Sequence, residues 1–410
     1  MALDKPVHVL VAGGGLSGLC LAQGLLKDGN TCEVFERDAD PRRSGYYLNI
    51  NGDGGEALRR CLPDDLFELY QATSRITPER SGSFVLDDQL HELSSQPHLG
   101  PPNEGPDRHT GVNRRTLRQI LLARLGDSFR AGVAVESYEE DADGVTVHLS
   151  DGSTAHGDVL VGADGIRSVV RSQRLPEVQV IEAGIDGLGV YGRTPLTPEL
   201  RATLPDILFQ GVIIAADSHG SRALLSAFQP RTAPDVAGAR LDPPVELEAV
   251  DDYFMVSCSV APGTVVPRSR DWTAGTPLML REAMAAAVQN WHPAVAALVR
   301  GIDLDTIFVI PFGRLDPPAP WTASRVTLIG DAAHAMLPTL GMGANLALRD
   351  AGKLAEQLRR AAAGDIPVVE AIGIAEDDMR DYTYPFVRAT MDHDHAFGGG
   401  ALERIAHAEA

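Results

Sequence analysis

Three glycines near the start of the chain have the spacing of a phosphate-binding turn. Gly13, Gly15 and Gly18 form a Gly-x-Gly-x-x-Gly pattern between a short apolar run at 7–11 and a helical pattern of apolar residues that begins at Leu16. The first glycine permits a tight bend, the second lets a pyrophosphate approach the backbone, and the third allows the helix to pack closely on the strand. The first amides of that helix would face the phosphate. This spacing therefore predicts a dinucleotide site.

An acidic residue stands where the ribose of a dinucleotide needs one. Glu36 ends a second predicted strand at 31–36, 18 residues after Gly18. Strand, helix and strand form a βαβ unit, in which a carboxylate at this position accepts hydrogen bonds from the adenosine ribose. These features leave both FAD and NAD open.

Two further strand ends carry an aspartate in a turn of small residues. Asp164 lies in the segment 162–168, and Asp331 lies in the segment 330–334. A carboxylate and backbone amides can meet a ligand at such a place. The alternative is that each aspartate caps the helix that follows it.

Taken together, these segments resemble those of the class A flavoprotein monooxygenases, the para-hydroxybenzoate hydroxylase family. The resemblance is carried by the glycine turn with Glu36-Arg37, by Asp164-Gly165, and by the long run from Gly330 to Ala351. It implies FAD as cofactor, NADH or NADPH as co-substrate, and O2. It also implies transfer of one oxygen atom from a flavin C4a-hydroperoxide to an aromatic or polycyclic small molecule.

The resemblance assigns roles to single residues. Asp331 would contact the ribityl and pyrophosphate region, Arg114 would hold the phosphates, and Val135 would touch the adenine through its backbone. The loop 338–345 would lie against the isoalloxazine ring, and the segment 45–49 would line the mobile flavin site. The expected cofactor-binding residues are Gly13, Gly15, Leu16, Ser17, Gly18, Glu36, Arg37, Arg114, Val135, Asp164, Asp331, Pro338, Gly341, Gly343, Ala344 and Asn345.

No side chain is predicted to act as a general acid or base, because the flavin performs the redox chemistry. The residues closest to that chemistry would be those of the flavin loop, Pro338, Gly341, Met342 and Gly343. His334 is interpreted as a structural hydrogen-bonding residue for the same reason. Met342, where many family members carry Gln or Lys, and the pair Tyr46-Tyr47 depart from the common family pattern and bear on flavin mobility and substrate fit.

Candidate substrate contacts belong to a presumed β-sheet face, where ordinary sheet packing is the alternative interpretation. They are Tyr47, Tyr191, Arg193, Phe209, Gln210 and Phe228.

The elements that must position these residues suggest an α/β fold with interleaved domains. We expect a discontinuous, Rossmann-like FAD-binding domain with an inserted β-rich substrate domain and a C-terminal helical region. The expected ranges are 1–75, 109–177 and 279–366 for the FAD-binding domain, 76–108 and 178–278 for the substrate domain, and 367–410 for the helical region. The run Asp392-His-Asp-His395 is interpreted as a solvated helix end, and no metal site is expected.

The composition of the chain limits the classes of partner that it can bind. The net charge of −20 repels phosphate backbones and anionic lipids, so nucleic acid is not an expected partner. No apolar run approaches the roughly 20 residues that span a bilayer, and no signal peptide is recognisable, which favours the cytoplasm. The four cysteines have no metal-like spacing and are interpreted as packing residues.

Two other functions stay open beside the monooxygenase. The same fold could serve an FAD-dependent reductase or oxidase without oxygen transfer, or a binding protein that has lost the cofactor. Substrate identity, the choice between NADH and NADPH, and the oligomeric state are not determined by the sequence.

Overall fold

A five-stranded parallel sheet carries the glycine turn. The structure is a computed structural model, and it describes residues 5–39, 46–103, 110–182, 188–259, 276–311 and 313–391. The strand order is β19-β11-β1-β2-β7, and every neighbouring pair is parallel. The strands are β1 (His8–Ala12), β2 (Thr31–Glu36), β7 (Phe129–Ala131), β11 (Val159–Gly162) and β19 (Val326–Leu328). The ends of β1, β11 and β19 therefore lie side by side, and the three predicted cofactor segments follow these ends.

Different layers cover the two faces of this sheet. On one face, Val9 and Val11 pack in a core with residues of α1 (Leu16–Lys27), α4 (Arg114–Leu122) and α11 (Gly343–Ala362). On the other face, Leu10 and Ala12 pack against a three-stranded meander of β8 (Val135–Glu140), β9 (Val145–Leu149) and β10 (Thr154–Gly157). Since β1 is buried on both faces, its sequence is continuously apolar rather than alternating.

The remaining helices of this part follow local signals in the sequence. Asn51 caps α2 (Gly52–Cys61) and Asn113 caps α4, each accepting hydrogen bonds from two amides of the first turn. The other elements here are α3 (Asp64–Ala72), α5 (Val169–Arg174), α10 (Asp331–His334), the paired strands β3 (Tyr47–Ile50) and β6 (Thr110–Asn113), the pair β12 (Val180–Glu182) and β18 (Gly313–Leu315), and the 3-10 turns Gly126–Ser128 and Pro338–Leu340.

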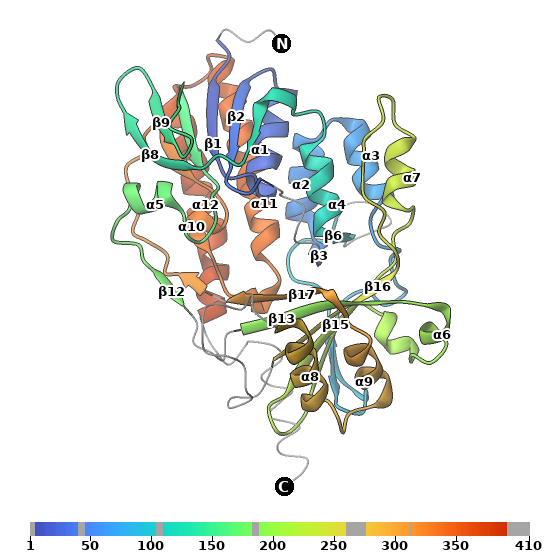
Figure 1. Cartoon of the computed structure of the whole chain (residues 1–410). Helices are drawn as coiled ribbons and strands as arrows, with labels where there is room; N and C mark the ends of the chain where they lie inside the picture. The colour runs from blue at the N-terminus through green and yellow to red at the C-terminus, as the bar shows by residue number, and fades with distance from the viewer. Residues whose placement is uncertain are drawn as a thin grey trace.

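A seven-stranded sheet forms the second part of the molecule. Figure 1 shows it lying across one end of the nucleotide-binding part, with α8 (Thr276–Ala287) and α9 (Pro293–Arg300) on the side turned away from that part. The strand order is β17-β13-β16-β15-β14-β4-β5. The strands are β4 (Ser83–Asp87), β5 (Glu92–Gln96), β13 (Leu188–Pro195), β14 (Val212–Ala216), β15 (Arg222–Phe228), β16 (Tyr253–Ser259) and β17 (Asp303–Pro311), with α6 (Pro198–Arg201), a 3-10 turn Asp206–Phe209 and α7 (Pro234–Ala239) in the connections.

The boundaries of this part differ from the predicted ones. The sequence predicts that residues 279–311 belong with the FAD-binding domain, but β17 pairs with β13, and the apolar residues of α8 and α9 pack beneath the seven-stranded sheet. In the opposite direction, α7 and the segment after it contribute Ala237, Val245 and Leu247 to the core of the nucleotide-binding part. Segments predicted in one part of the molecule thus pack in the other. Their placement depends on contacts between residues far apart in the sequence, which local sequence patterns do not encode.

The chain then continues along α11 into α12 (Val368–Met391), which packs beside α11 (Figure 1). Asp392 to His395, like the rest of 392–410, lie outside the described residues. Within the described ranges, no helix combines the length and the apolar character needed to cross a membrane. All four cysteines are buried thiols, as the packing interpretation requires.

Candidate FAD site and substrate face

The glycine turn is held by close backbone packing. Gly13 has a φ of +104°, and a β-carbon built on it would lie 2.4 Å from the carbonyl oxygen of Ala163. A β-carbon on Gly18 would lie 2.1 Å from the carbonyl oxygen of Gly13. At Gly15, by contrast, the nearest atom would be 4.0 Å away. Gly13 and Gly18 are thus required by the packing of the protein itself, whereas Gly15 leaves space for a ligand at the start of α1.

Glu36 and Arg118 hold the outer side of the same turn. The backbone N–H of Gly14 donates to Oε2 of Glu36 at 2.9 Å, and Nε of Arg118 donates to the carbonyl oxygen of Gly14 at 2.8 Å. Nη2 of Arg118 lies 3.3 Å from the same Glu36 oxygen. Sequence reasoning missed Arg118, although it lies one helical turn after Arg114. The neighbouring Arg37 is exposed and lies 3.8 Å from Asp38.

Asp164 lies directly behind the glycine turn. Its Oδ2 accepts hydrogen bonds from the amides of Val169 at 2.8 Å and Val170 at 3.4 Å, so this oxygen caps the start of α5. Its Oδ1 is buried and has no hydrogen-bond partner among the described residues. The capping interpretation is therefore supported by the contacts of Oδ2, and the role of Asp164 toward a cofactor stays a prediction.

Gly330 lies where α1, α11 and the third segment meet. Its φ is +59°, and a β-carbon on it would lie 3.0 Å from Cβ of Ala347 and 3.1 Å from Oγ of Ser17. The next residue, Asp331, is exposed to solvent. Burial nevertheless raises the pKa of the Asp331 carboxyl, opposed by the charges of His334 and Arg114. The carboxyl of Asp331 is thus partly desolvated by the surrounding protein, and the positive charge of Arg114 acts on it.

His334 makes a buried hydrogen bond within the protein. Its Nε2 lies 2.5 Å from Oδ2 of Asp350, and both side chains are buried. Burial alone would lower the pKa of the His334 ring, but the charge of Asp350 and the hydrogen bond to it raise the pKa overall. Asp350 was not singled out from the sequence.

The flavin loop leads into a helix without a side-chain cap. Gly341 has a φ of +65°, and the described residues place no atom within 4 Å of a β-carbon built on it. At Gly343 the one atom within 4 Å, among the residues that the structure describes, would be Cγ of Met336 at 3.8 Å. Neither α1 nor α11 has a side-chain N-cap, unlike α2 and α4. The first amides of α11, from Gly343 through Ala344, are therefore free of intrahelical partners and of a cap.

The side chain of Asn345 is used within the protein. Its Oδ1 accepts from the amide of Asn51 at 2.9 Å, and its Nδ2 donates to the carbonyl oxygen of Asn49 at 2.9 Å. Met342 is also buried, with Nδ2 of Asn51 3.5 Å from its sulfur. These contacts tie the start of α11 to the end of β3. Val135 lies apart from them, at the start of β8 in the core below the sheet.

One face of the seven-stranded sheet brings together four of the six predicted substrate residues. Tyr191 stacks on Phe308 with ring centroids 5.4 Å apart, and Tyr46 lies 5.6 Å from Phe308. The Arg193 guanidinium lies 5.5 Å from the ring of Tyr253. Burial raises the pKa of Tyr191 to about 12, so its hydroxyl stays protonated at neutral pH. Tyr47 and Phe228 complete the face by packing on one another with ring centroids 6.5 Å apart.

Phe209 and Gln210 do not belong to this face, contrary to the sequence prediction. Phe209 packs on Phe254 at 5.3 Å, in the core beneath α8 and α9. The side-chain oxygen of Gln210 accepts from the amide of Arg80 at 2.9 Å. Successive strand residues alternate between faces, so Phe254 points away from its neighbour Tyr253. Phe308 and Tyr253, which sequence reasoning missed, could have been found from this alternation along β16 and β17.

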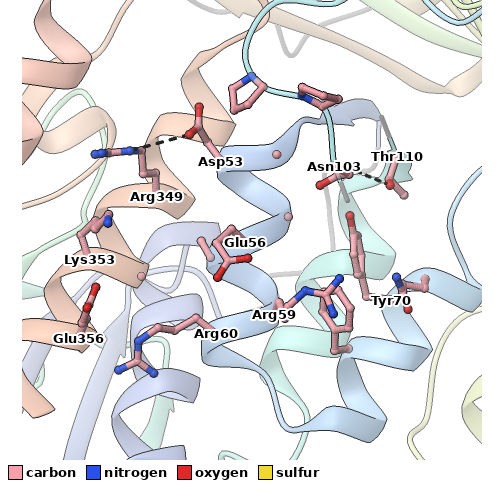
Figure 2. A pocket seen from close by; sticks show the side chains of 18 of the residues that line it. Asp53, Glu56, Arg59, Arg60, Tyr70, Asn103, Thr110, Arg349, Lys353 and Glu356 are labelled. Carbon is pink, nitrogen blue, oxygen red and sulfur yellow. Dashed lines mark hydrogen bonds and ion pairs between the residues drawn. The ribbon is translucent and has the colours of Figure 1, made fainter. Parts of the chain in front are cut away.

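A separate cavity of about 860 Å³ opens between α2, α3 and α11. Figure 2 shows charged side chains of both signs around it, with Arg349 directed toward Asp53 at 3.9 Å. Lys353, Glu56 and Glu356 line the same space. None of the predicted cofactor or substrate residues is among those that line it, so this cavity is distinct from the glycine turn and the sheet face.

The comparisons with known proteins agree with this geometry. The FAD binding domain family matches residues 6–235 and 318–367, which is more than half of the chain. The chain is 30% identical over 400 residues to a dual O-methyltransferase/FAD-dependent monooxygenase of Cercospora beticola, covering 91% of this chain and 44% of that protein. It is 29% identical to an FAD-dependent monooxygenase of Trichoderma harzianum, covering 86% of this chain and 83% of that protein. The chain thus spans less than half the length of the first of these relatives.

Solved structures show the same architecture. A protein of Photorhabdus luminescens, provisionally described as an FAD-containing monooxygenase, has a TM-score of 0.77 at 28% identity, with coverage of 98% of this chain and 100% of that one. HpxO of Klebsiella pneumoniae, in complex with FAD and uric acid, shares the fold at 21% identity, with a TM-score of 0.73 and coverage of 98% and 92%. The resemblance found in the sequence is confirmed: the chain belongs to the FAD binding domain family, with the fold of the class A flavoprotein monooxygenases.

Proposed function

We propose that this protein is an FAD-dependent monooxygenase that uses NADH or NADPH and O2 to insert one oxygen atom into an aromatic or polycyclic small molecule. The observation that carries the proposal is the junction at Gly330. There the helix after the glycine turn, through Ser17, and the helix after the flavin loop, through Ala347, meet the turn that presents Asp331.

The residues around this junction fit FAD in chemistry and in space. Open backbone at Gly15 and the uncapped amides of Leu16 and Ser17 would take the pyrophosphate. Asp331, which is exposed and feels the charge of Arg114, would bind the ribityl region while the arginine neutralises phosphate charge. Glu36 would accept hydrogen bonds from the ribose hydroxyls with Oε1, which also accepts from the amide of Asp38 at 2.9 Å.

The start of α11 would serve the reactive end of the cofactor. Bound FAD would supply the electron transfer to O2 and the oxygen transfer, which no protein side chain performs. The amides of Gly343, Ala344 and Asn345 would stabilise the negative charge that grows at one edge of the flavin on reduction. Gly341 and Gly343 leave open space for a ring beside this helix end.

The aromatic face of the seven-stranded sheet would orient the substrate and exclude water. Tyr191 and Phe308 stack on one another, and the ring of Tyr46 lies tilted beside both. Such a group of rings suits a flat apolar molecule. Arg193 is half-buried beside them and has no carboxylate partner among the residues that the structure describes. A polar oxygen of the substrate is its proposed partner.

The first test is the cofactor itself. Purified protein should be yellow, or should gain the absorbance of bound oxidised flavin when FAD is added. A substrate screen that follows NADH and NADPH oxidation together with product mass then tests the reaction. Protein that never acquires flavin absorbance refutes the proposal. Flavin reduction and reoxidation without any oxygenated product would instead indicate the reductase or oxidase of the same fold.

A further inference from the structure

One buried carboxylate connects two of the proposed FAD-binding segments. Oδ2 of Asp350, on α11, accepts a hydrogen bond from the amide of Gly330 at 2.9 Å and lies 2.5 Å from Nε2 of His334. The side chains of His334 and Asp350 are 1% and 2% exposed. A single oxygen therefore holds both ends of the short segment that contains Asp331.

The geometry of Gly330 explains how this contact can orient Asp331. Gly330 has a positive φ, and a β-carbon on it would be tightly packed between Ser17 and Ala347, at 3.0–3.1 Å. Asp331 follows directly, so its direction depends on the orientation of the Gly330 peptide. Asp350 fixes that peptide through its amide, and it fixes the other end of α10 through His334.

The same residue belongs to the helix that would face the flavin. Asp350 lies two turns after Gly343, which is about 10 Å along a helix that rises 1.5 Å per residue. A shift of Asp331 relative to α11 would change the distance between the two proposed FAD contacts. The Asp350 carboxylate restrains this shift.

We propose that Asp350 is a positioning residue for FAD, which holds Asp331 in register with the start of α11 through Gly330 and His334. This inference rests on the proposed FAD function but not on oxygen transfer. Both partners act as donors to one carboxylate oxygen, so the role needs the negative charge as well as the shape of the side chain. Asparagine keeps an acceptor for the Gly330 amide but removes the charge opposite His334.

The test compares three variants by FAD binding and by apoprotein stability. Asp350→Asn should raise the Kd for FAD about tenfold or more, as expected for the loss of a charged hydrogen bond that orients a ligand contact. Asp28→Asn is the control, because Asp28 pairs with Arg60 at 2.6 Å at the far end of α1. The double variant Asp350→Asn with His334→Gln should regain part of the lost affinity, because a neutral donor then faces a neutral acceptor.

The readouts are FAD fluorescence quenching, thermal unfolding of the apoprotein, and the visible spectrum of bound flavin. We expect Asp350→Asn to shift the flavin spectrum, while Asp28→Asn lowers the unfolding temperature without changing affinity or spectrum. A Kd for Asp350→Asn equal to that of the wild type, or raised no more than in Asp28→Asn, would overturn the inference. If Asp350→Asn does not fold, the FAD affinity of the single variant His334→Gln tests the inference instead. A Kd for FAD in His334→Gln equal to that of the wild type would then overturn it. Failure of the wild-type protein to bind FAD would instead overturn the proposed function.

Discussion

The backbone of Gly13 lies against the carbonyl oxygen of Ala163, so closely that a β-carbon on Gly13 would be 2.4 Å from that oxygen. This contact joins the turn after β1 to the turn after β11. It places Asp164 directly behind the glycine turn. The turns after β1 and β11 therefore form one continuous surface at the carboxyl ends of the strands.

Alanine at Gly13 and at Gly15 should have different effects. Gly13→Ala introduces a side chain at positive φ and in steric conflict, so we expect a loss of about 3 kcal/mol or more in the free energy of unfolding. A β-carbon on Gly15 would come no closer than 4.0 Å to the nearest atom that the described residues place there, the carbonyl oxygen of Ala163. Gly15→Ala should therefore unfold nearly as the wild type does, yet bind FAD at least about tenfold more weakly, because its methyl group enters the phosphate space. Urea unfolding of the apoprotein and FAD titration separate the two. Equal FAD affinity in Gly15→Ala and the wild type would contradict the phosphate assignment.

Removing the Asp331 carboxylate should weaken cofactor retention. We expect Asp331→Ala to raise the Kd for FAD by roughly 10- to 100-fold, because a charged hydrogen-bonding partner is lost. Asp316→Ala is a suitable control, since Asp316 is an exposed carboxylate on the same stretch of chain. The measurement is the fraction of flavin that survives gel filtration. Equal retention in the two variants would refute the role of Asp331.

The sheet face should control substrate affinity and not cofactor affinity. Arg193→Gln should raise the KM for the substrate about tenfold with the FAD content unchanged, because a half-buried guanidinium loses a charged contact. Gln210→Ala should leave KM unaltered, since Gln210 contacts the backbone of Arg80 away from this face. Steady-state kinetics with the substrate found in the screen decide the matter. An unchanged KM in Arg193→Gln would remove this residue from the site.

The buried pair of His334 and Asp350 should make stability depend on pH. The folded-state pKa of His334 lies above its unfolded value, and Asp350 and Asp331 are the acids that raise it. Its stabilising contribution is therefore fully present below about pH 6.5, the ordinary histidine value, and is lost as the pH rises through the raised folded-state pKa. Urea unfolding of the wild type and of His334→Gln across this range should show a difference that shrinks toward alkaline pH. A difference that grows with pH would show that the ring is neutral in the folded protein.

The sequence predicts the elements whose signals are local. The strand at Thr31–Glu36 has the predicted bounds, because turn residues precede it and Glu36 marks its end. The three proposed cofactor segments were recognisable because glycines and aspartates at strand ends are themselves local signals.

Long-range pairing explains what the sequence does not predict. The assignment of β17 to the seven-stranded sheet depends on β13, more than a hundred residues away. Asp350 and Arg118 became visible as functional candidates only when their buried partners, His334 and Gly14, were in place. Phe209 was misplaced because it lies in the 3-10 turn Asp206–Phe209, and its contact with Phe254 in the core shared with α8 and α9 depends on long-range packing.

The most direct test of the account is the fate of O2 during turnover. Protein reconstituted with FAD would be supplied with NADH or NADPH, ¹⁸O2 and each of a panel of aromatic and polycyclic compounds, while nucleotide oxidation, peroxide release and product mass are followed together. The account predicts, for at least one compound, a product that contains one labelled oxygen atom in proportion to the nucleotide oxidised. Reducing equivalents that all emerge as peroxide or as a reduced, unlabelled product would contradict it.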